Sequence, residues 1–290
     1  MGGSGSKVDQ TPFQELETPW RTFDWNQKKV LKERLESFAV SNTDVKCIKV
    51  LVTGQIGAGK SSFINSVLST FQGEIVCEAL ADAVDKSHSF TKKLTTYRIK
   101  RNETEDLPFV IIDMIGIEPE TLTVQQLEDI MNTIQGHVKE NYKFKIDKQL
   151  TPEDEEYYKK DADISDQVFC LVYVLDTNYI ATNDRLFDHL RTIRLQANDK
   201  GIPQVIVMTK VDEACPLVKK DLRKIYTSRK IKQKIEVCSA SVGVPISNIF
   251  PVKNYHNETD TNDDVDVLIL KVFDQIVRSA NARLRRGAFN

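Results

Sequence analysis

Continuous apolar segments, each ending in a polar residue, recur along the chain. They read VKCIKVLVT at 45–53, LPFVIID at 107–113, QVFCLVYVLD at 167–176 and PQVIVMT at 203–209. Apolar runs without alternation predict strands of a parallel sheet that is covered on both faces. Residues 94–101, LTTYRIKR, alternate polar and apolar side chains and predict a strand with one exposed face. The last predicted strand is NIFPV at 248–252.

Helical periodicity fills the intervals between these strands. It covers residues 60–71, 121–140, 183–198, 216–237 and 263–284. Strands and helices that alternate in this way predict an α/β fold, with a mostly parallel, doubly wound sheet of about six strands flanked by helices. With 40% hydrophobic residues in 290, the chain holds enough apolar material for one sizeable core.

The remaining segments set the limits of the predicted domain. Residues 1–17 lack a hydrophobic signal core, and we expect them to be a flexible leader or tag. We expect a single domain over 18–284, with a helix near its N-terminus that docks onto the main body, and a tail at 285–290. Residues 141–166 are charged and poor in core residues, which predicts a surface insertion or an ordered loop.

Charge and cysteine content exclude several classes of protein. The formal net charge is −2, so no global basic field draws the chain to nucleic acid or anionic lipid. The five cysteines are widely spread and form no CxxC pair, which favours reduced thiols in a cytoplasmic protein over disulfides or a zinc site. The longest strongly apolar run, at 168–175, is far shorter than the roughly 20 residues that cross a bilayer.

A glycine-rich loop, GQIGAGKSS at 54–62, follows the first strand and matches G-x-x-x-x-G-K-[ST]. Glycines let the backbone curl so that its N–H groups point at phosphate oxygens, and the next helix adds its positive N-terminal dipole. Lys60 is predicted to reach the β- and γ-phosphates, and Ser61 to ligate Mg²⁺. The predicted nucleotide-binding residues here are Gln55, Ile56, Gly57, Ala58, Gly59, Lys60, Ser61 and Ser62.

Two later strand ends indicate which nucleotide is bound. IIDMIG carries D-x-x-G, so Asp113 is predicted to hold Mg²⁺ through water and the Gly116 amide to sense the γ-phosphate. MTKVD carries T-K-x-D at Thr209, Lys210 and Asp212. A carboxylate at Asp212 can accept hydrogen bonds from guanine N1–H and its 2-amino group, a donor pair that adenine lacks. The predicted cofactors are therefore GTP or GDP, with Mg²⁺.

Two further site predictions rest on position alone. The base contact beyond the last strand is assigned to Lys253 and Asn254, in PVKNY, whereas CSAS at 238–241 is predicted to end a helix. The threonine that covers the γ-phosphate and Mg²⁺ must lie between the first helix and the second strand. Thr91 is chosen there, because the alternatives Thr95 and Thr96 fall inside the predicted strand.

The segments TGQIGAGKSSFINSV, FQG, LPF, D-x-x-G and V-x-NY, in this order, resemble the GTP-binding domain of the interferon-induced protein 44 and 44-like family. The resemblance covers roughly residues 18–280. It implies a P-loop G-domain fold, guanine-nucleotide binding, and a cytoplasmic, interferon-induced protein with antiviral associations. Members usually carry another domain before the G domain, so we expect this chain to be a short paralogue or an excised domain.

Hydrolysis is the point at which the sequence departs from the small signalling GTPases. Ile117 stands where those enzymes carry a glutamine that orients the attacking water, and Ile56 stands where an inserted arginine usually needs glycine. We therefore expect weak hydrolysis, or hydrolysis stimulated by a second copy or a protein partner across the nucleotide face. The alternative is a nucleotide-dependent interaction module without significant turnover; nucleic acid is an unlikely partner. Candidate replacements for the glutamine are His88, Lys92 and Lys93.

Overall fold

The computed structural model describes residues 15–79, 93–102, 104–118, 122–145, 148–180 and 184–287. Within them, six strands form one sheet in the order β2-β3-β1-β4-β5-β6. They are β1 (Ile48–Gly54), β2 (Thr95–Lys100), β3 (Asp106–Asp113), β4 (Cys170–Asp176), β5 (Gln204–Thr209) and β6 (Ile249–Pro251). All neighbouring strands run parallel except β2, which pairs antiparallel with β3. The predicted fold class is confirmed.

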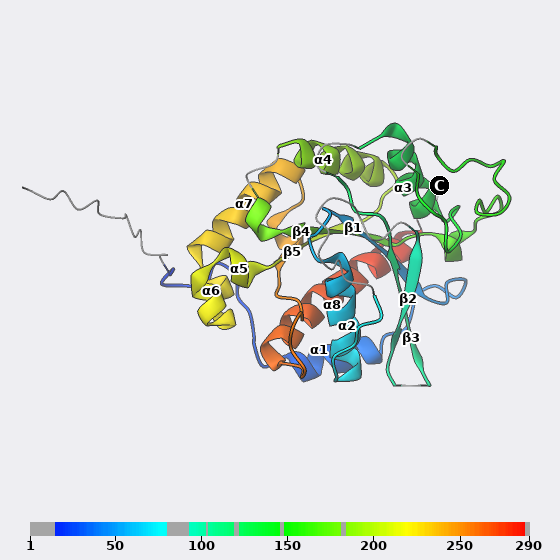
Figure 1. Cartoon of the computed structure of the whole chain (residues 1–290). Coiled ribbons are helices and arrows are strands. Elements are labelled where there is room, and N and C mark those ends of the chain that lie inside the picture. The colour runs from blue at the N-terminus through cyan, green and yellow to red at the C-terminus, as the bar shows by residue number, and fades with distance from the viewer. Residues whose placement is uncertain are drawn as a thin grey trace, which may run out of the picture.

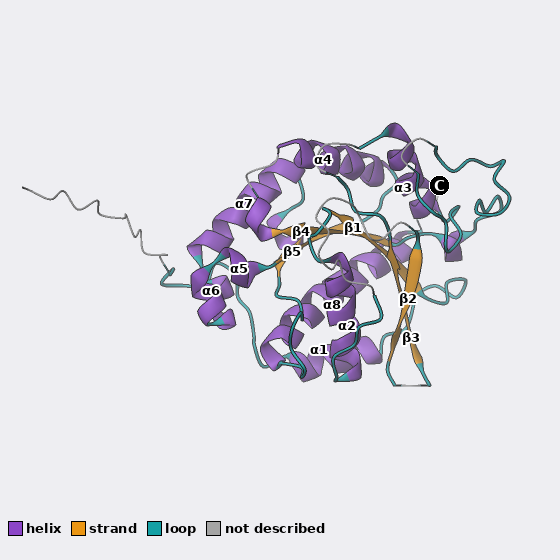
Figure 2. Ribbon diagram, in the orientation of Figure 1, coloured by secondary structure: helices purple, strands orange, loops and turns teal. Residues whose placement is uncertain are grey.

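Helices cover both faces of the sheet (Figures 1 and 2). One layer holds α1 (Lys28–Glu36), α2 (Lys60–Gln72) and α8 (Asp263–Arg286), which contact one another. The other layer holds α3 (Val124–Gln135), α4 (Asp184–Asp199) and α7 (Arg229–Val242). Two short helices, α5 (Val211–Ala214) and α6 (Pro216–Lys220), follow β5. This doubly wound arrangement leaves the carboxyl ends of the parallel strands free to form a site.

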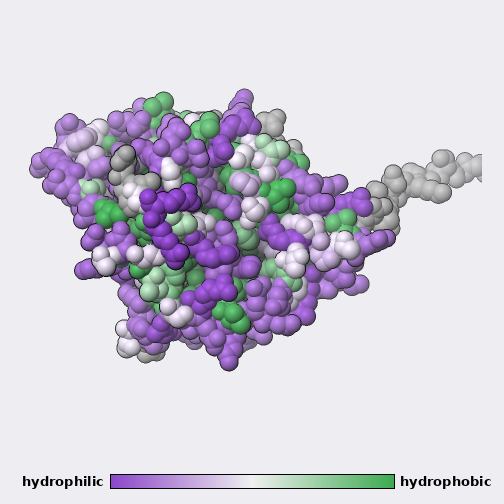
Figure 3. Space-filling model, turned by 180° about the vertical axis from the view of Figure 1, so that it is seen from behind, coloured by the Kyte–Doolittle hydropathy of each residue, from purple (hydrophilic) through white to green (hydrophobic). Residues whose placement is uncertain are grey.

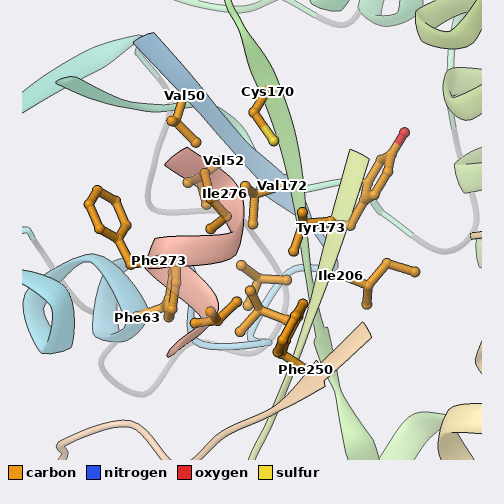
Figure 4. Close-up of a cluster of buried hydrophobic side chains, with 14 of the residues drawn as sticks. Val50, Val52, Phe63, Cys170, Val172, Tyr173, Ile206, Phe250, Phe273 and Ile276 are labelled. Atoms are coloured by element: carbon orange, nitrogen blue, oxygen red, sulfur yellow. The ribbon is translucent and has the colours of Figure 1, made fainter. Parts of the chain in front are cut away.

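The core lies on both sides of β4, whose seven residues are all buried. In Figure 4, Val172 lies on the same side of the sheet as Phe273 of α8, whereas Tyr173 points to the opposite side. Phe273 meets Phe109 of β3 edge-on, with ring centroids 5.4 Å apart. Because successive strand residues face opposite ways, a strand buried between two helical layers must be apolar at nearly every position.

One helix prediction was wrong. The pattern at 216–237 predicted a single helix, but the chain there forms α6, a 3₁₀ turn and then α7. The Asp221 side chain accepts the Arg223 N–H at 2.9 Å, and Ser228 accepts the Ile231 N–H at 3.2 Å. Short polar side chains that bond to nearby backbone in this way interrupt a helix and begin the next one. The CSAS segment lies inside the last turns of α7, as predicted.

Two loop segments are fastened to this framework. Near the N-terminus, Trp20 and Phe23 pack against Tyr226, with ring centroids 5.1 and 4.8 Å from it. In the described part of 141–166, Tyr142 donates to Asp129 Oδ2 at 3.0 Å and the Leu150 N–H donates to Oδ1 at 2.8 Å. Burial raises the pKa of Asp129, although these two hydrogen bonds act to lower it. Aromatic packing therefore fastens the first segment, and hydrogen bonds to a buried carboxylate fasten the second.

The face of the molecule shown in Figure 3 is mainly hydrophilic, and its apolar residues form small groups. Among the described residues, the large apolar side chains that are exposed come from separate elements. They are Val30, Val124, Tyr179, Leu195, Val237 and Ile246. Single exposed apolar residues of this kind are ordinary on protein surfaces. No helix among the described residues is long and apolar enough to cross a membrane.

Candidate functional site

The glycine-rich loop between β1 and α2 has a backbone that only glycine adopts readily. Gly59 is the N-cap residue of α2 with φ of 83°, in the left-handed region. At Gly54 a Cβ atom would collide with the carbonyl oxygen of Val174 in β4. The sequence pattern therefore corresponds to a curled loop that leads directly into a helix N-terminus, which is a geometry suited to anions.

A cavity of about 450 Å³ opens beside this loop, at the carboxyl ends of the strands. We call it the main cavity. Its lining residues are Gly57, Gly59, Ser61, Ser62, Lys210, Asp212, Glu213, Lys219, Lys253, Asn254, Tyr255, His256, Asn257 and Glu258. The volume lies in the range of roughly 300–1,000 Å³ that is typical of small-molecule sites. The main cavity thus joins predicted phosphate-binding residues to predicted base-binding residues.

The T-K-x-D segment after β5 is tied to the glycine-rich loop. Lys210 adopts a left-handed conformation with φ of 56°. Its Nζ donates to the Gly57 carbonyl at 2.9 Å and pairs with the Asp176 carboxylate at 2.8 Å. The Thr209 hydroxyl donates to the Ala58 carbonyl at 2.6 Å. Asp212, half-buried in the first turn of α5, is thereby held at a fixed place across the main cavity from the loop.

The residues that follow β6 close the opposite side of the main cavity; we call residues 253–258 the base loop. Lys253 Nζ pairs with Glu258 at 2.6 Å, and the Asn254 amide donates to the Gly59 carbonyl at 3.1 Å. The other Glu258 oxygen accepts the backbone N–H groups of His256 and Asn257. Burial alone would raise the pKa of Glu258, but the hydrogen bond from Lys253 and those from the backbone N–H groups of His256 and Glu258 lower it to about 2.

Tyr255 fastens the base loop to the helices below the sheet. Its backbone N–H donates to Ser66 Oγ of α2 at 2.9 Å, and its hydroxyl donates to Asp266 Oδ1 of α8 at 2.7 Å. Thr70 of α2 donates to the same carboxylate oxygen at 2.9 Å, and Lys28 of α1 pairs with its other oxygen at 2.7 Å. Burial raises the pKa of the Tyr255 hydroxyl. The base loop is therefore hydrogen-bonded to both α2 and α8.

Lys60 and Gly116 approach each other outside the lining of the main cavity, and Asp113 ends β3 three residues before Gly116; we call this place the inner corner. Lys60 is 4% exposed and its Nζ donates to the Gln55 carbonyl at 3.2 Å, while Asp113 is 2% exposed at the end of β3. A Cβ atom on Gly116 would lie 2.7 Å from Lys60 Nζ, so the two are in close contact. Thr91, His88 and Lys92 lie outside the described residues.

Comparison with known proteins places this arrangement in a family. The family model described as 50S ribosome-binding GTPase matches residues 49–210, from β1 to the T-K-x-D lysine. This chain belongs to that GTPase family. The match spans more than half of the chain and includes the glycine-rich loop and the D-x-x-G segment.

The named relatives of this GTPase-family chain confirm the resemblance drawn from its motifs. Interferon-induced protein 44 of Mus musculus is 31% identical over 239 residues, covering 82% of this chain and 56% of the relative. Interferon-induced protein 44-like of Homo sapiens is 28% identical over 236 residues, covering 81% and 52%. The chain thus spans about half the length of these curated relatives. A solved structure, a probable GTP-binding protein engB, overlays with a TM-score of 0.41 and 13% identity, over 81% of this chain and 99% of that one.

Within this GTPase fold, sequence reasoning missed two acidic residues at the site. Asp176 ends β4 and its side chain is 3% exposed where it pairs with Lys210. A carboxylate at the end of a buried apolar strand was the signal that could have found it. Glu258 had no such signal, because its role depends on a loop that folds back to Lys253.

Proposed function

We propose that this chain is a guanine-nucleotide binding protein that takes GTP and GDP in the main cavity and hydrolyses GTP weakly or with stimulation. The observation that carries the proposal is the pair of contacts from Thr209 and Lys210 to the glycine-rich loop. They fix the distance between a phosphate-binding helix N-terminus and the carboxylate of Asp212. A bound nucleotide must span these two groups, so the site is preorganised for a ligand of a particular length.

Selection of guanine is assigned to Asp212, because this half-buried carboxylate lines the main cavity. Guanine N1–H and its 2-amino group would each donate to one carboxylate oxygen. Adenine offers no matching donor pair and would leave the carboxylate without partners, which is strongly unfavourable in a confined site. Lys253 and Asn254 are proposed to contact the base from the opposite side, as residues of the base loop.

Mg²⁺ fits the oxygen groups near the glycine-rich loop. Ser61 begins the first turn of α2 and lines the main cavity, and Asp113 ends the neighbouring strand β3. Hydroxyl and carboxylate oxygens, together with water and phosphate, are the ligands that Mg²⁺ prefers. We propose that Ser61 and Asp113, together with Thr91, hold the ion. When bound, it would supply positive charge beside the phosphate oxygens.

Weak turnover is proposed because of Ile117. Its side chain is 4% exposed and carries no group that can hydrogen-bond to water. A small GTPase normally uses a glutamine at this position to orient the attacking water, and stimulation by an arginine is worth about 10³–10⁵ in rate. A second copy of the chain, or another protein, would have to supply the missing groups across the nucleotide face.

The second candidate function is a nucleotide-dependent interaction module without significant turnover. It is favoured by the same buried isoleucine, because a site without a water-orienting group can still bind nucleotide and change conformation. The relatives named interferon-induced protein 44 support a place in the interferon response for either candidate. An antiviral role and a cytoplasmic location are proposed on the same basis.

Nucleotide binding and turnover on one preparation test the proposal. GTP, GDP and ATP are titrated in the presence of Mg²⁺, and phosphate release is then followed over a range of protein concentrations. We expect GTP and GDP to bind and ATP to bind far more weakly. A specific rate that rises with protein concentration supports stimulation by a second copy. A rate near zero at every concentration supports the interaction module, and equal binding of ATP would contradict the role of Asp212.

A further inference from the structure

The inner corner of the site is closed in this structure. Of the residues predicted to meet the γ-phosphate or its Mg²⁺, four are described: Ser61 lines the main cavity, whereas Lys60, Asp113 and Gly116 do not. The cavity lining does include Ser61, Ser62 and the base-binding residues. The described cavity therefore reaches the glycine-rich loop and the predicted base-binding residues, but not Lys60, Asp113 or Gly116.

Backbone pairing closes this corner. The parallel pairing of β1 with β3 continues past the end of β3, where Gln55 and Ile117 form a further bridge. The Ile117 N–H donates to the Gly54 carbonyl at 2.7 Å, and the Ile56 N–H donates to the Ile117 carbonyl at 3.3 Å. The segment after β3 is thus hydrogen-bonded directly to the glycine-rich loop.

The bridge places Gly116 against the ammonium group of Lys60, which a third phosphate would need as its partner. A Cβ atom on Gly116 would lie 2.7 Å from Lys60 Nζ and 2.8 Å from Ile56 Cγ1, so no space remains between these groups. Ile117 itself is 4% exposed and belongs to the main apolar core. An apolar side chain in this place stabilises the closed arrangement, whereas a glutamine would be poorly suited to the same burial.

We propose that the Gln55–Ile117 bridge makes the closed site selective for guanosine diphosphate, and that a triphosphate must break the bridge in order to bind. Ile117 is then the residue that determines selectivity between the two nucleotides. The inference rests on the proposed function, because it concerns the same cavity. A triphosphate displaces Gly116 from Lys60, and the cost of unpairing residues 116–117 lowers its affinity relative to the diphosphate.

Two measurements test this selectivity. The first compares the affinities of GDP and of a non-hydrolysable GTP analogue, with Mg²⁺, for the wild type and for Ile117→Gly. We expect the wild type to prefer GDP, and the preference to fall about tenfold in the variant. Glycine keeps both backbone hydrogen bonds of the bridge, but it removes the buried apolar side chain and adds backbone freedom that opposes the closed arrangement. Ile134→Ala in α3 is the matched control: Ile134 is 1% exposed and lies outside the cavity lining, so the preference should persist.

The second measurement uses the wild-type chain and does not depend on the stability of a variant. Hydrogen exchange is followed at the amides of Ile56 and Ile117, with GDP and with the GTP analogue. We expect both amides to be protected with GDP and to exchange faster with the analogue. Equal protection in the two complexes, or an unchanged preference in a folded Ile117→Gly variant, would overturn the inference. Failure of the wild type to bind either nucleotide would instead overturn the proposed function.

Discussion

The base end and the inner corner of the nucleotide site are held in different ways. At the base end, side-chain hydrogen bonds from Lys210 and Asn254 reach the glycine-rich loop and leave an open cavity between the elements. At the inner corner, main-chain hydrogen bonds of Ile117 join two segments directly and leave no space. Side-chain contacts can hold two loops apart at a fixed distance, whereas backbone pairing brings them together. The base end is therefore preorganised for a ligand, and under our proposal the corner must open to admit a third phosphate.

The largest expected effect is at the base end, for Asp212→Asn. The variant should lose about 100-fold in affinity for GDP, because its amide can accept only one of the two hydrogen bonds and each one to a charged acceptor is worth about 1.5–3 kcal/mol. Xanthosine diphosphate should gain affinity, since its 2-oxo group can accept the hydrogen bond that the new amide donates. Calorimetric titration with both nucleotides measures how far the preference shifts from GDP toward xanthosine diphosphate.

Asp199→Asn, an exposed carboxylate at the end of α4, is the control for this substitution and should change neither affinity. If Asp212→Asn kept the wild-type affinity for GDP, the base would have to bind elsewhere. The open base end would then not be the place where the base binds, and the comparison with the closed corner would not apply to the bound nucleotide.

The next effect concerns the link between the two loops, through Lys210→Met. The substitution removes the ion-pair partner that lies 2.8 Å from the Asp176 carboxylate, and the side chain of Asp176 is 3% exposed. A buried carboxylate without a cation is costly, so we expect a loss of about 2–3 kcal/mol in the free energy of unfolding. Urea unfolding measures the loss, with the exposed Lys220→Met as control. Equal stability of the two variants would show that the link is not structural.

The smallest effect is the pH dependence of the base loop. The pKa of Glu258 is lowered from 4.5 to about 2, so its ionised form stabilises the folded state at pH values above 4.5. This contribution is lost as pH falls from 4.5 toward 2. Because the Lys253–Glu258 pair is partly exposed, screening limits the contribution to about 1 kcal/mol.

Urea unfolding of the wild type and of Glu258→Gln between pH 7 and pH 3 checks this prediction. The difference in stability should be present at neutral pH and shrink as the acid range is entered. Glu236→Gln, which breaks only an exposed pair with Lys232 on α7, should show a smaller difference at neutral pH. If the difference in stability between the wild type and Glu258→Gln stayed constant with pH, the charge of Glu258 would not be its cause.

The sequence alone was sufficient for the order of the strands and of the longer helices outside 211–242, and for the placement of the motif residues at strand ends. Unbroken apolar runs such as 167–176 can be satisfied only by burial on both faces, so the pattern implies a parallel sheet between helices. The carboxyl ends of such strands meet at one edge of the sheet, which is why Gly57, Lys210 and Asn254 line one cavity. These features follow from local pattern and from general rules of topology.

Only the structure decided the remaining features: one depends on local bonds between side chains and backbone, and the others depend on contacts between residues far apart in the chain. The break in the predicted helix at 216–237 required knowing that Asp221 and Ser228 bond to nearby backbone. The pairing of Asp176 with Lys210 required two strand ends to be side by side. At Ile117 the sequence showed that a glutamine was missing, whereas the fold showed what stands in its place: a backbone bridge to the glycine-rich loop, formed because β1 and β3 continue their pairing beyond the end of the strand.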